Sequence, residues 1–506
     1  MEDYVLGAPE GTFTDSRVVF ESVLAMLASQ EAGALSHAEL EERLFAQGRE
    51  LLRTLLQDHL HLRAVREVRV DAVTGSDGVE RRAAEPGHRR TLATVFGEVV
   101  VERIAYRAKG TGNLHPADAM LNLPSEKHSH GLRRLAAIEA VRGSFADARD
   151  AVTRSTGASV GKRQIEQLAQ RAAVDVDDFY RERRPGPREE EVLLVLSLDA
   201  KGVVMLPDSL RECTRRNASA KAAAGGQLLA TRLSSGEKLG RKRMAGVGAV
   251  YDAVPVPRLV GDVIPATALD REDKTAGPVA EGKWVTASVE ATCAQVVAAV
   301  FDEAERRDPE HLRTWVILVD GAKHQLDLVQ AEAARRQVAV HIVCDFVHVL
   351  EYLWKAAWCF HPPGDKAAEA WVATQARKIL AGKAKTVAAA IRNKATRAGL
   401  APQRRTGADT CAGYLHAKAP YLHYGRALTA GWPIATGIIE GVCRHLVKDR
   451  MDITGARWGL AGAEAVLKLR ALHANGDFEE YWHYHLQREQ MRVHAIRYRD
   501  ALALAA

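Results

Sequence analysis

The chain has 506 residues, of which 47% are hydrophobic and 26% charged, and its formal net charge is +6. This length favours about three domains over one compact core, and the mildly basic charge permits a nucleic-acid partner without requiring one. Because no apolar run approaches the ~18–20 residues that span a bilayer, and the six cysteines are scattered without a CxxC pair, we expect a cytoplasmic protein with no membrane partner, disulfide scaffold or zinc ribbon.

The first 125 residues are predicted to form a mainly helical region with one β-hairpin. Apolar residues recur at helical spacing from about residue 15 to 58, as on one face of an amphipathic helix. The segment TLATVFGEVVVERIAYR (Thr91 to Arg107) instead clusters and alternates β-branched residues. That pattern indicates two strands around Gly97.

Residues 126–183 carry the pattern of a helix-turn-helix domain. Ser144 to Ala173 reads as two short amphipathic helices separated by TGASVG, and a short turn containing glycine is typical of that motif. An ordinary αα-hairpin in a helical bundle has the same pattern, so both interpretations stay open. In the first, the residues that read DNA lie at the start of the second helix: Lys162, Arg163 and Gln164. The charged, proline-containing segment 181–191 is predicted to be a linker.

The segment 190–346 alternates strand and helix patterns. Three short apolar runs, each predicted to be a buried strand, end at aspartates: Asp199, Asp320 and Asp345. A further strand is predicted at Lys242 to Val254, with the following PVPRLV continuing it or pairing with it. Helices are predicted at Val285 to Arg307 and at LDLVQAEAARRQ. This alternation predicts a mixed α/β sheet covered on both faces.

From Val347 to about Ala430 the pattern is helical, and part of it is strongly basic. Between Gln375 and Ala408 there is no acidic residue and there are nine basic ones: Arg377, Lys378, Lys383, Lys385, Arg392, Lys394, Arg397, Arg404 and Arg405. A stretch of one sign in a nearly neutral protein suggests a surface that follows phosphates. We expect Arg392 and Lys394 to contact DNA.

The segment GIIEGVCRHLVKDRMD (Gly437 to Asp452) follows this block. If a helix starts near Ile438, then Glu440, Arg444 and Lys448 share one face. The buried side is then expected to be formed by Ile439, Val442, Cys443 and Leu446. An exposed Glu–Arg pair near a helix N-terminus is the simplest interpretation. In the alternative, Glu440 binds a metal ion, and three basic residues meet phosphates: Arg444, Lys448 and Arg450.

Asp199, Asp320 and Glu440 together predict a cation site. Each aspartate alone is explained by the turn that follows its strand, but ligands also gather at the carboxyl edge of such a sheet. Three converging carboxylates repel one another unless a cation neutralises them. Carboxylates suit Mg²⁺ or Mn²⁺, and two such ions about 4 Å apart can promote cleavage of a phosphodiester.

Other sites are less well supported. Asp449 and Asp452 are rival carboxylates for the cation. A zinc interpretation of the nearby histidines and cysteines matches no common ligand spacing; these are His341, Cys344, His348, Cys359 and His361. No GxxxxGK[ST] or GxGxxG follows a predicted strand, so we expect no nucleotide cofactor.

An ordered set of motifs resembles the DDE-type transposases of bacterial insertion sequences, and among them the Kra family. The motifs are LSLDAKGV, WVILVDGAKHQ, CDFVHVLEYLWKAA and GIIEGVCRHLVKDRMDITGARW, with FGEVVVERIAYR, GLRRLAA and SFADARDAVTRSTGASVGKRQIEQLA upstream. The resemblance covers roughly residues 90 to 475. It implies an α/β ribonuclease-H-like catalytic domain, preceded by the mainly helical N-terminal region with its β-hairpin and helix-turn-helix. The catalytic core would comprise 190–346 and 431–475, with an all-helical insertion at 347–430 and a basic C-terminal helix at 476–506.

The resemblance also implies a reaction and its residues. Asp199, Asp320 and Glu440 match the catalytic, metal-binding carboxylates, and the cofactor implied is Mg²⁺ or Mn²⁺, as two ions. Asp345 and His348 resemble the (Cys/Asp)-x-x-His motif of insertion-bearing transposases and would be auxiliary active-site residues. The enzyme would cleave DNA at the ends of its element, and the freed 3′-hydroxyl would attack target DNA.

The partners implied are double-stranded DNA, as element ends and as target, and further copies of the chain in a homodimer or higher oligomer. A nucleoid-associated location in the cytoplasm follows. Two alternatives stay open: a non-catalytic, sequence-specific DNA-binding protein derived from a transposase, and a stand-alone ribonuclease-H-like nuclease.

Overall fold

The computed structural model of the protein describes residues 11–186, 188–223, 241–266, 274–453 and 455–499. The chain divides into two compact units, one made of residues 1–181 with 476–506 and the other of residues 182–475. The fold is mixed α/β, and the second unit contains a five-stranded mixed sheet. Within the described residues, no helix has the length and apolar composition needed to cross a membrane.

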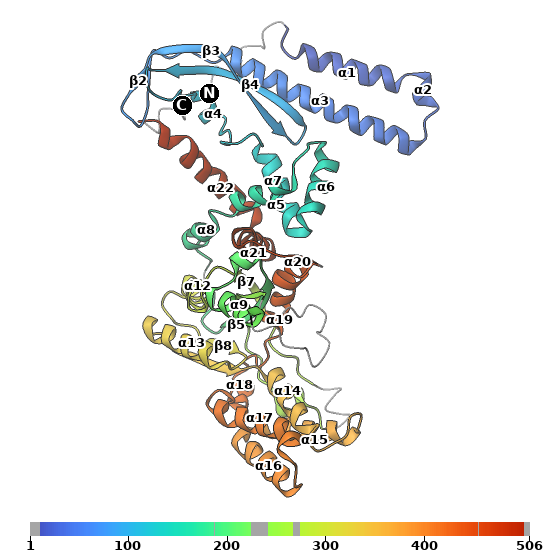
Figure 1. The fold of residues 1–506 in the computed structure, drawn as a ribbon, viewed down its shortest axis with the longest axis vertical. Coiled ribbons are helices and arrows are strands. Elements are labelled where there is room, and N and C mark those ends of the chain that lie inside the picture. Colours follow the sequence, from blue (N-terminus) through green and yellow to red (C-terminus); the bar gives the residue numbers. More distant parts are fainter. Residues whose placement is uncertain (1–10, 187, 224–240, 267–273, 454, 500–506) are drawn as a thin grey trace. The chain divides into compact units, whose positions relative to one another are not determined.

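The first unit begins with helices that pack on a β-hairpin. The helices are α1 (Thr14–Leu27), α2 (Gln30–Gly33) and α3 (His37–Val65). The hairpin predicted around Gly97 is confirmed, and its antiparallel strands are β3 (Ala83–Thr94) and β4 (Gly97–Arg107). Helix α3 lies along β4 (Figure 1), and the apolar side chains between them form a core of Leu60, Leu92, Val99, Val101 and Leu123. A short strand pair precedes the hairpin, β1 (Val73–Thr74) with β2 (Glu80–Arg81).

The two helices predicted as a helix-turn-helix are confirmed as helices. They are α6 (Phe145–Thr156) and α7 (Lys162–Ala172), and both pack against α5 (His130–Arg142). Gly157 ends α6 with φ 69°, a left-handed conformation that glycine adopts without steric cost. Ile165 and Leu168 of α7 are fully buried, which orients the start of that helix toward solvent. The short helix α4 (Pro116–Met120) precedes this group.

The C-terminal segment expected as a separate basic helix belongs to the first unit. It forms α22 (Phe478–Val493) and a 3₁₀ turn, η5 (Ala495–Arg497), while α8 (Val176–Glu182) ends the first pass of the chain through this unit. The buried His485 ring lies 2.6 Å from the Asp175 carboxylate. Arg492 of α22 pairs with the same carboxylate at 2.8 Å, so Asp175 anchors α22 to the rest of the first unit.

The sheet of the second unit has the strand order β7-β6-β5-β8-β9. The strands are β5 (Leu193–Val204), β6 (Lys242–Ala253), β7 (Glu281–Ser288), β8 (Trp315–Val319) and β9 (Val340–Cys344). Strand β5 is antiparallel to β6 and parallel to β8, and β8 is parallel to β9. The three predicted apolar runs therefore form three neighbouring parallel strands, with β5 at the centre of the sheet.

Helices cover both faces of the sheet, as predicted. On one face lie α12 (Cys293–Arg307) and α13 (Lys323–Arg336). Gly248 of β6 permits this contact, because a Cβ there would stand 2.3 Å from Val300 Cγ2. The other face carries α19 (Gly437–Val442), the π-helical turn η4 (Cys443–Lys448), α20 (Asp449–Met451) and α21 (Leu460–Asn475). Short helices in the connections are η2 (Pro207–Ser209), α9 (Glu212–Ala223) and α10 (Val260–Val263).

Three predicted boundaries in this unit were wrong. Strand β5 does not end at Asp199, since Ala200 to Val204 continues in register with β6. The segment PVPRLV neither extends β6 nor pairs with it; its first five residues are irregular and α10 begins at Val260. The helix predicted from Val285 begins at Cys293, because residues 285–288 pair with β6 as part of β7.

The block predicted to be helical after β9 is confirmed. It consists of α14 (Phe346–Ala357), α15 (Lys366–Leu380), α16 (Ala384–Arg397), α17 (Pro402–Lys418), η3 (Ala419–Tyr421) and α18 (Tyr424–Thr429). Helices α14 to α17 lie side by side (Figure 1). Two tyrosines tie this block to the sheet: the Tyr414 hydroxyl donates to the Asp320 carbonyl at 3.0 Å, and the Tyr424 hydroxyl to the Cys344 carbonyl at 2.8 Å.

Candidate functional site

The register of the sheet aligns three aspartates at one edge. The ladder between β5 and β8 ends with the pair Ser197 and Leu318, and the ladder between β8 and β9 ends with Val319 and Cys344. The same register, continued by two residues and by one, sets Asp199 beside Asp320 and Asp320 beside Asp345. The Asp345 N–H still donates to the Val319 carbonyl at 2.8 Å. The carboxyl edge of the parallel strands therefore carries a row of acidic residues.

Asp199 and Glu440 line one hollow of about 510 Å³ in the second unit. The basic residues around this hollow are Lys201, Arg444 and Lys448. Lys201 was not singled out from the sequence. It could have been predicted from its position two residues after Asp199, because side chains two apart on a strand point to the same face of the sheet. Asp449 also lines the hollow, so this hollow places three carboxylates next to three cations.

Cys443 contacts the Asp199 carboxylate directly. Its Sγ lies 3.2 Å from Asp199 Oδ2, while Asp199 Oδ1 accepts the N–H of Ala200 at 2.6 Å. Burial, followed by the negative charge of Asp199, holds the pKa of the Cys443 thiol well above its ordinary value. The thiol is therefore a hydrogen-bond donor that orients the Asp199 carboxylate.

Glu440 is influenced by neighbouring negative charge. Partial burial raises the pKa of its carboxyl, and Asp345 and then Asp199 raise it further. The ionised form of Glu440 is thus less favourable here than in water. A bound cation would reverse this effect, because it would favour the ionised carboxylate.

Asp320 lies on the neighbouring strand but does not line the hollow. Its Oδ1 accepts the N–H of Ala322 at 2.8 Å, so the carboxylate opens the turn after β8. Within the described part of the chain, no three His, Cys, Asp or Glu side chains stand close enough to hold one metal ion. The structure therefore brings Asp199 and Glu440 together and leaves the Asp320 carboxylate engaged in its own turn.

Asp345 and His348, predicted as auxiliary residues, differ in their surroundings. Asp345 is only 4% exposed, and its Oδ1 accepts the N–H of Val347 at 3.0 Å and of Thr436 at 3.1 Å. The His348 Nδ1 is 3.4 Å from Glu351, and its ring meets Tyr352 edge-on. Asp345 thus joins the end of β9 to the residue before α19, the helix that carries Glu440.

The helix that carries Glu440 has largely the predicted buried and exposed sides. Ile439, Cys443 and Leu446 are buried as predicted, and Val447 is buried as well, whereas Val442 is only half-buried. Arg444 and Lys448 remain exposed and line the hollow.

Arg450, predicted to contact DNA, is 2% exposed, and its guanidinium lies 4.7 Å from the ring centre of Trp458. Arg450 follows Cys443 by seven residues and Leu446 by four, so helical spacing places it on the same buried side as these two residues. This correction removes Arg450 from the phosphate-facing surface.

The remaining predicted DNA contacts are partly accessible. In the first unit Lys162 and Arg163 are exposed at the start of α7, whereas the Gln164 side chain accepts the Gly161 N–H at 2.9 Å and so caps the helix. In the second unit Arg392 is exposed on α16. The Lys394 ammonium lies 4.7 Å from the Phe360 ring centre and 5.2 Å from that of Trp371.

The histidines and cysteines considered for zinc are also engaged elsewhere. The His341 ring stacks on Trp432 with ring centres 4.4 Å apart, and Cys344 is fully buried.

Comparison of the sequence with models of known protein families and with curated proteins gives no match.

Proposed function

We propose that the protein is a DNA transposase whose second unit is a ribonuclease-H-like catalytic domain with a DDE carboxylate set. The observation that carries this proposal is that Asp320 directly follows β8, the parallel neighbour of the strand β5 that carries Asp199, together with the hollow that Asp199 shares with Glu440. The resemblance expects these same three residues at one site. Cleavage at element ends and transfer of the 3′-hydroxyl strand to target DNA is the activity that follows.

The topology of the second unit supports the fold part of the proposal. In chain order, Asp199 is on the first strand of the sheet, β5, and Asp320 follows the fourth, β8. After the fifth strand, β9, the described chain is helical until Glu440 on α19. This is the order that the resemblance implies, with the helical block as an insertion.

The donor set fits Mg²⁺ or Mn²⁺. All three residues offer carboxylate oxygens, which hard divalent cations prefer. Asp320 uses Oδ1 in its turn, and no hydrogen bond to Oδ2 is recorded among the described residues, so one oxygen is available to a cation. When bound, two such ions would activate the attacking oxygen and stabilise the leaving oxygen of a phosphodiester. Asp199, Asp320 and Glu440 would hold them.

The side chains around the hollow supply the remaining functions. Lys201, Arg444 and Lys448 provide positive charge for DNA phosphates beside the carboxylates, and such contacts position the backbone without reading its sequence. Cys443 orients Asp199 through its thiol. In the first unit, the exposed start of α7 would read element ends. DNA ends and target DNA are thus the proposed partners, and a homodimer or higher oligomer would bring two ends together.

The test is Mg²⁺- or Mn²⁺-dependent nicking of labelled DNA that carries the element's own ends. We expect the wild-type protein to leave a 3′-hydroxyl, and Asp320→Asn and Glu440→Gln to bind DNA without cutting. Asp449→Asn is the matched control, because Asp449 lines the same hollow but is a rival rather than a member of the proposed set. Cutting by Glu440→Gln at the wild-type rate would remove Glu440 from the site.

Two other results would point to the rival functions. If the wild type binds its DNA ends and never cuts them, a non-catalytic DNA-binding protein becomes the better interpretation. The Asp320 carboxylate, engaged in its own turn, is the observation that favours this rival. If the wild type cuts equally well without terminal repeats, a stand-alone nuclease is favoured.

A further inference from the structure

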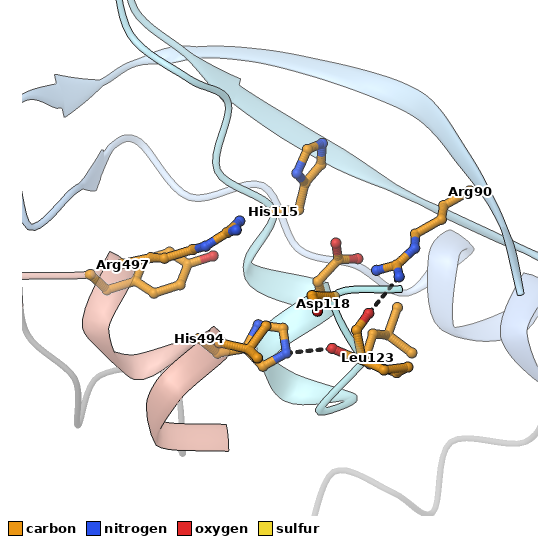
Figure 2. Close-up of a pocket in the computed structure, with 10 residues that line it drawn as sticks. Arg90, His115, Asp118, Leu123, His494 and Arg497 are labelled. Atoms are coloured by element: carbon orange, nitrogen blue, oxygen red, sulfur yellow. Dashed lines mark hydrogen bonds between the residues drawn. The ribbon is translucent and has the colours of Figure 1, made fainter. Parts of the chain in front are cut away.

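A second cavity, of about 90 Å³, lies within the first unit. It is lined by polar residues from three distant parts of the chain: Arg90 of β3, His115 and Asp118 at α4, and His494, Arg497 and Tyr498 at the C-terminal end. Figure 2 shows Arg90 and Arg497 approaching from opposite sides, with Asp118 between them. None of these residues belongs to the proposed catalytic site.

The charges around this cavity are unbalanced. Asp118 is the only carboxylate in its lining, and it is already paired with Arg103, whose Nε lies 2.7 Å from Asp118 Oδ1. Arg90 donates to the backbone carbonyls of Pro124 and Glu126, which carry no net charge. Among the residues that the structure describes, neither Arg90 nor Arg497 has a carboxylate within ion-pair distance. The lining therefore carries two guanidinium groups and one carboxylate, and that carboxylate is already paired with Arg103 outside the lining.

Two histidines also line the cavity, and one of them can donate into it. The His115 Nε2 is buried and has no hydrogen-bond partner within the described chain, an uncommon state for a buried polar atom. The His494 Nε2 donates to the Leu123 carbonyl at 2.7 Å (Figure 2), so the neutral ring has no second N–H to offer. Burial and nearby arginines lower the pKa of both rings. An anion in the cavity would satisfy His115 and offset the repulsion among the cations.

We propose that this cavity binds a phosphate group that carries a protonatable oxygen, as inorganic phosphate or a phosphate monoester. The planar donor forks of Arg90 and Arg497 match the oxygens of a tetrahedral anion. Asp118 gives selectivity. Its Oδ2 is only weakly engaged, at 3.4 Å from Arg103 Nη2, and it can accept a hydrogen bond from a phosphate hydroxyl. Sulfate and phosphodiesters carry no such hydroxyl, so the carboxylate would repel them.

Phosphate binding would also hold the C-terminal residues 493–499 against the rest of the first unit. The Arg497 carbonyl accepts the N–H of Ser76 at 2.9 Å, and the Arg499 N–H donates to the Thr74 carbonyl at 3.1 Å. Tyr498 forms a bridge with Gly75 in the same place. Because His494 and Arg497 of this segment contribute to the cavity, a bound phosphate would be contacted by both partners of this docking. It would therefore slow opening of the segment.

The test is calorimetric titration of the full-length protein with inorganic phosphate and, separately, with sulfate. We expect one saturable phosphate site, with sulfate binding at least about tenfold weaker. Arg497→Gln should weaken phosphate binding by about tenfold or more. This side chain is exposed, so the variant is expected to fold. Arg89→Gln is the matched control: Arg89 is the neighbour of Arg90 on β3, is 73% exposed and pairs with Glu102, and its loss should leave binding unchanged.

Other outcomes decide between the sources of phosphate or overturn the proposal. Tighter binding of a 5′-phosphorylated than of an unphosphorylated oligonucleotide, lost in Arg497→Gln, would identify the ligand as a nucleic-acid end. Equal binding of the two oligonucleotides, with inorganic phosphate still bound, would identify the free ion. Equal phosphate affinity in Arg497→Gln and wild type, or equal affinity for sulfate and phosphate, would overturn the proposal. Phosphate should also slow amide exchange over residues 493–499 in the wild type and not in Arg497→Gln. The proposal does not depend on the transposase function.

Discussion

The Asp345 carboxylate accepts the backbone N–H of Thr436 at 3.1 Å, across 91 residues of chain. The neighbouring Phe346 N–H donates to the Ile434 carbonyl at 2.9 Å. These bonds fix the start of α19 against the end of β9, on the sheet edge that carries Asp320. Glu440 owes its place near Asp199 to this connection across the helical block, and Asp345 is therefore a positioning residue.

Asp345→Ala should reduce DNA cutting by about tenfold or more while DNA binding is kept, because the Val347 and Thr436 N–H groups lose their acceptor and α19 is no longer fixed. The Thr436 N–H is buried, and leaving such a group unsatisfied costs about 1–3 kcal/mol, so we also expect lower thermal stability. Asp345→Asn keeps the accepting Oδ1 and should retain most of the activity. Cutting rates and thermal unfolding of the three proteins measure this. If Asn is as damaging as Ala, the negative charge itself is required, as for a metal ligand.

The pH dependence of cutting should reflect Glu440. Burial, Asp345 and Asp199 raise the pKa of this carboxyl above its usual value of 4.5, and the proposed reaction needs the ionised form. At subsaturating Mg²⁺, where the cation-free site dominates, activity is thus present above the raised pKa and is lost as the pH falls through it. Asp345→Asn removes one of the negative charges, so the inflection in its pH–rate profile should move to lower pH. An unchanged inflection would show that another group controls the acid limb.

Arg392 and Lys394, both expected to contact DNA, should behave differently when neutralised. Arg392 is exposed, so Arg392→Gln should weaken DNA binding and reduce the slope of log K against log salt by about 1. Lys394 lies over the rings of Phe360 and Trp371. Lys394→Gln should therefore lower thermal stability by about 1 kcal/mol with a smaller change in the salt slope. Equal changes of slope in both variants would place Lys394 among the phosphate contacts.

Local patterns predicted the strands β8 and β9, because each is a short apolar run. They also predicted the helical block, because its apolar residues recur at helical spacing. The errors arose where pairing between distant segments decided the structure. Val285 to Ser288 continue the helical spacing of α12, yet pairing of Ala287 with Val247 makes them part of β7. Ala200 to Val204 lack the apolar run of Leu193 to Leu198, and β6 alone keeps them in the strand. Such long-range pairing overrides local preference.

The candidate site shows the same limit. Asp320 and Asp345 follow strand ends and Glu440 lies on a helix, as predicted, whereas the predicted end of β5 at Asp199 was wrong. The sequence did not predict Cys443 as a donor to Asp199, since that contact depends on how η4 packs on β5. The prediction of Arg450 as a phosphate contact was wrong although its spacing from Cys443 and Leu446 is that of one helix face, and the structure buries all three. Lys201 could have been predicted, because residues two apart along a strand place their side chains on the same face.

His130 should make the first unit less stable in mild acid. Its Nε2 lies 2.7 Å from the Asn122 carbonyl and its Nδ1 3.2 Å from the Arg133 guanidinium; the neutral ring fits both contacts, donating from Nε2 and accepting at Nδ1. Burial and then Arg133 lower its pKa from 6.5 to about 4. Between these two pH values His130 binds a proton in the unfolded chain but not in the folded chain. The free energy of unfolding of the first unit therefore falls as the pH falls through this window.

This loss should appear as faster amide exchange in α5 at pH 5 than at pH 7, after correction for intrinsic exchange rates. His130→Gln keeps an amide donor and acceptor but does not titrate, so the extra loss between these pH values should disappear in that variant. His37→Gln is the control, because the His37 side chain is 86% exposed and should leave the pH dependence of α5 unchanged. An identical pH dependence in wild type and His130→Gln would mean that His130 is not the group that destabilises this unit in acid.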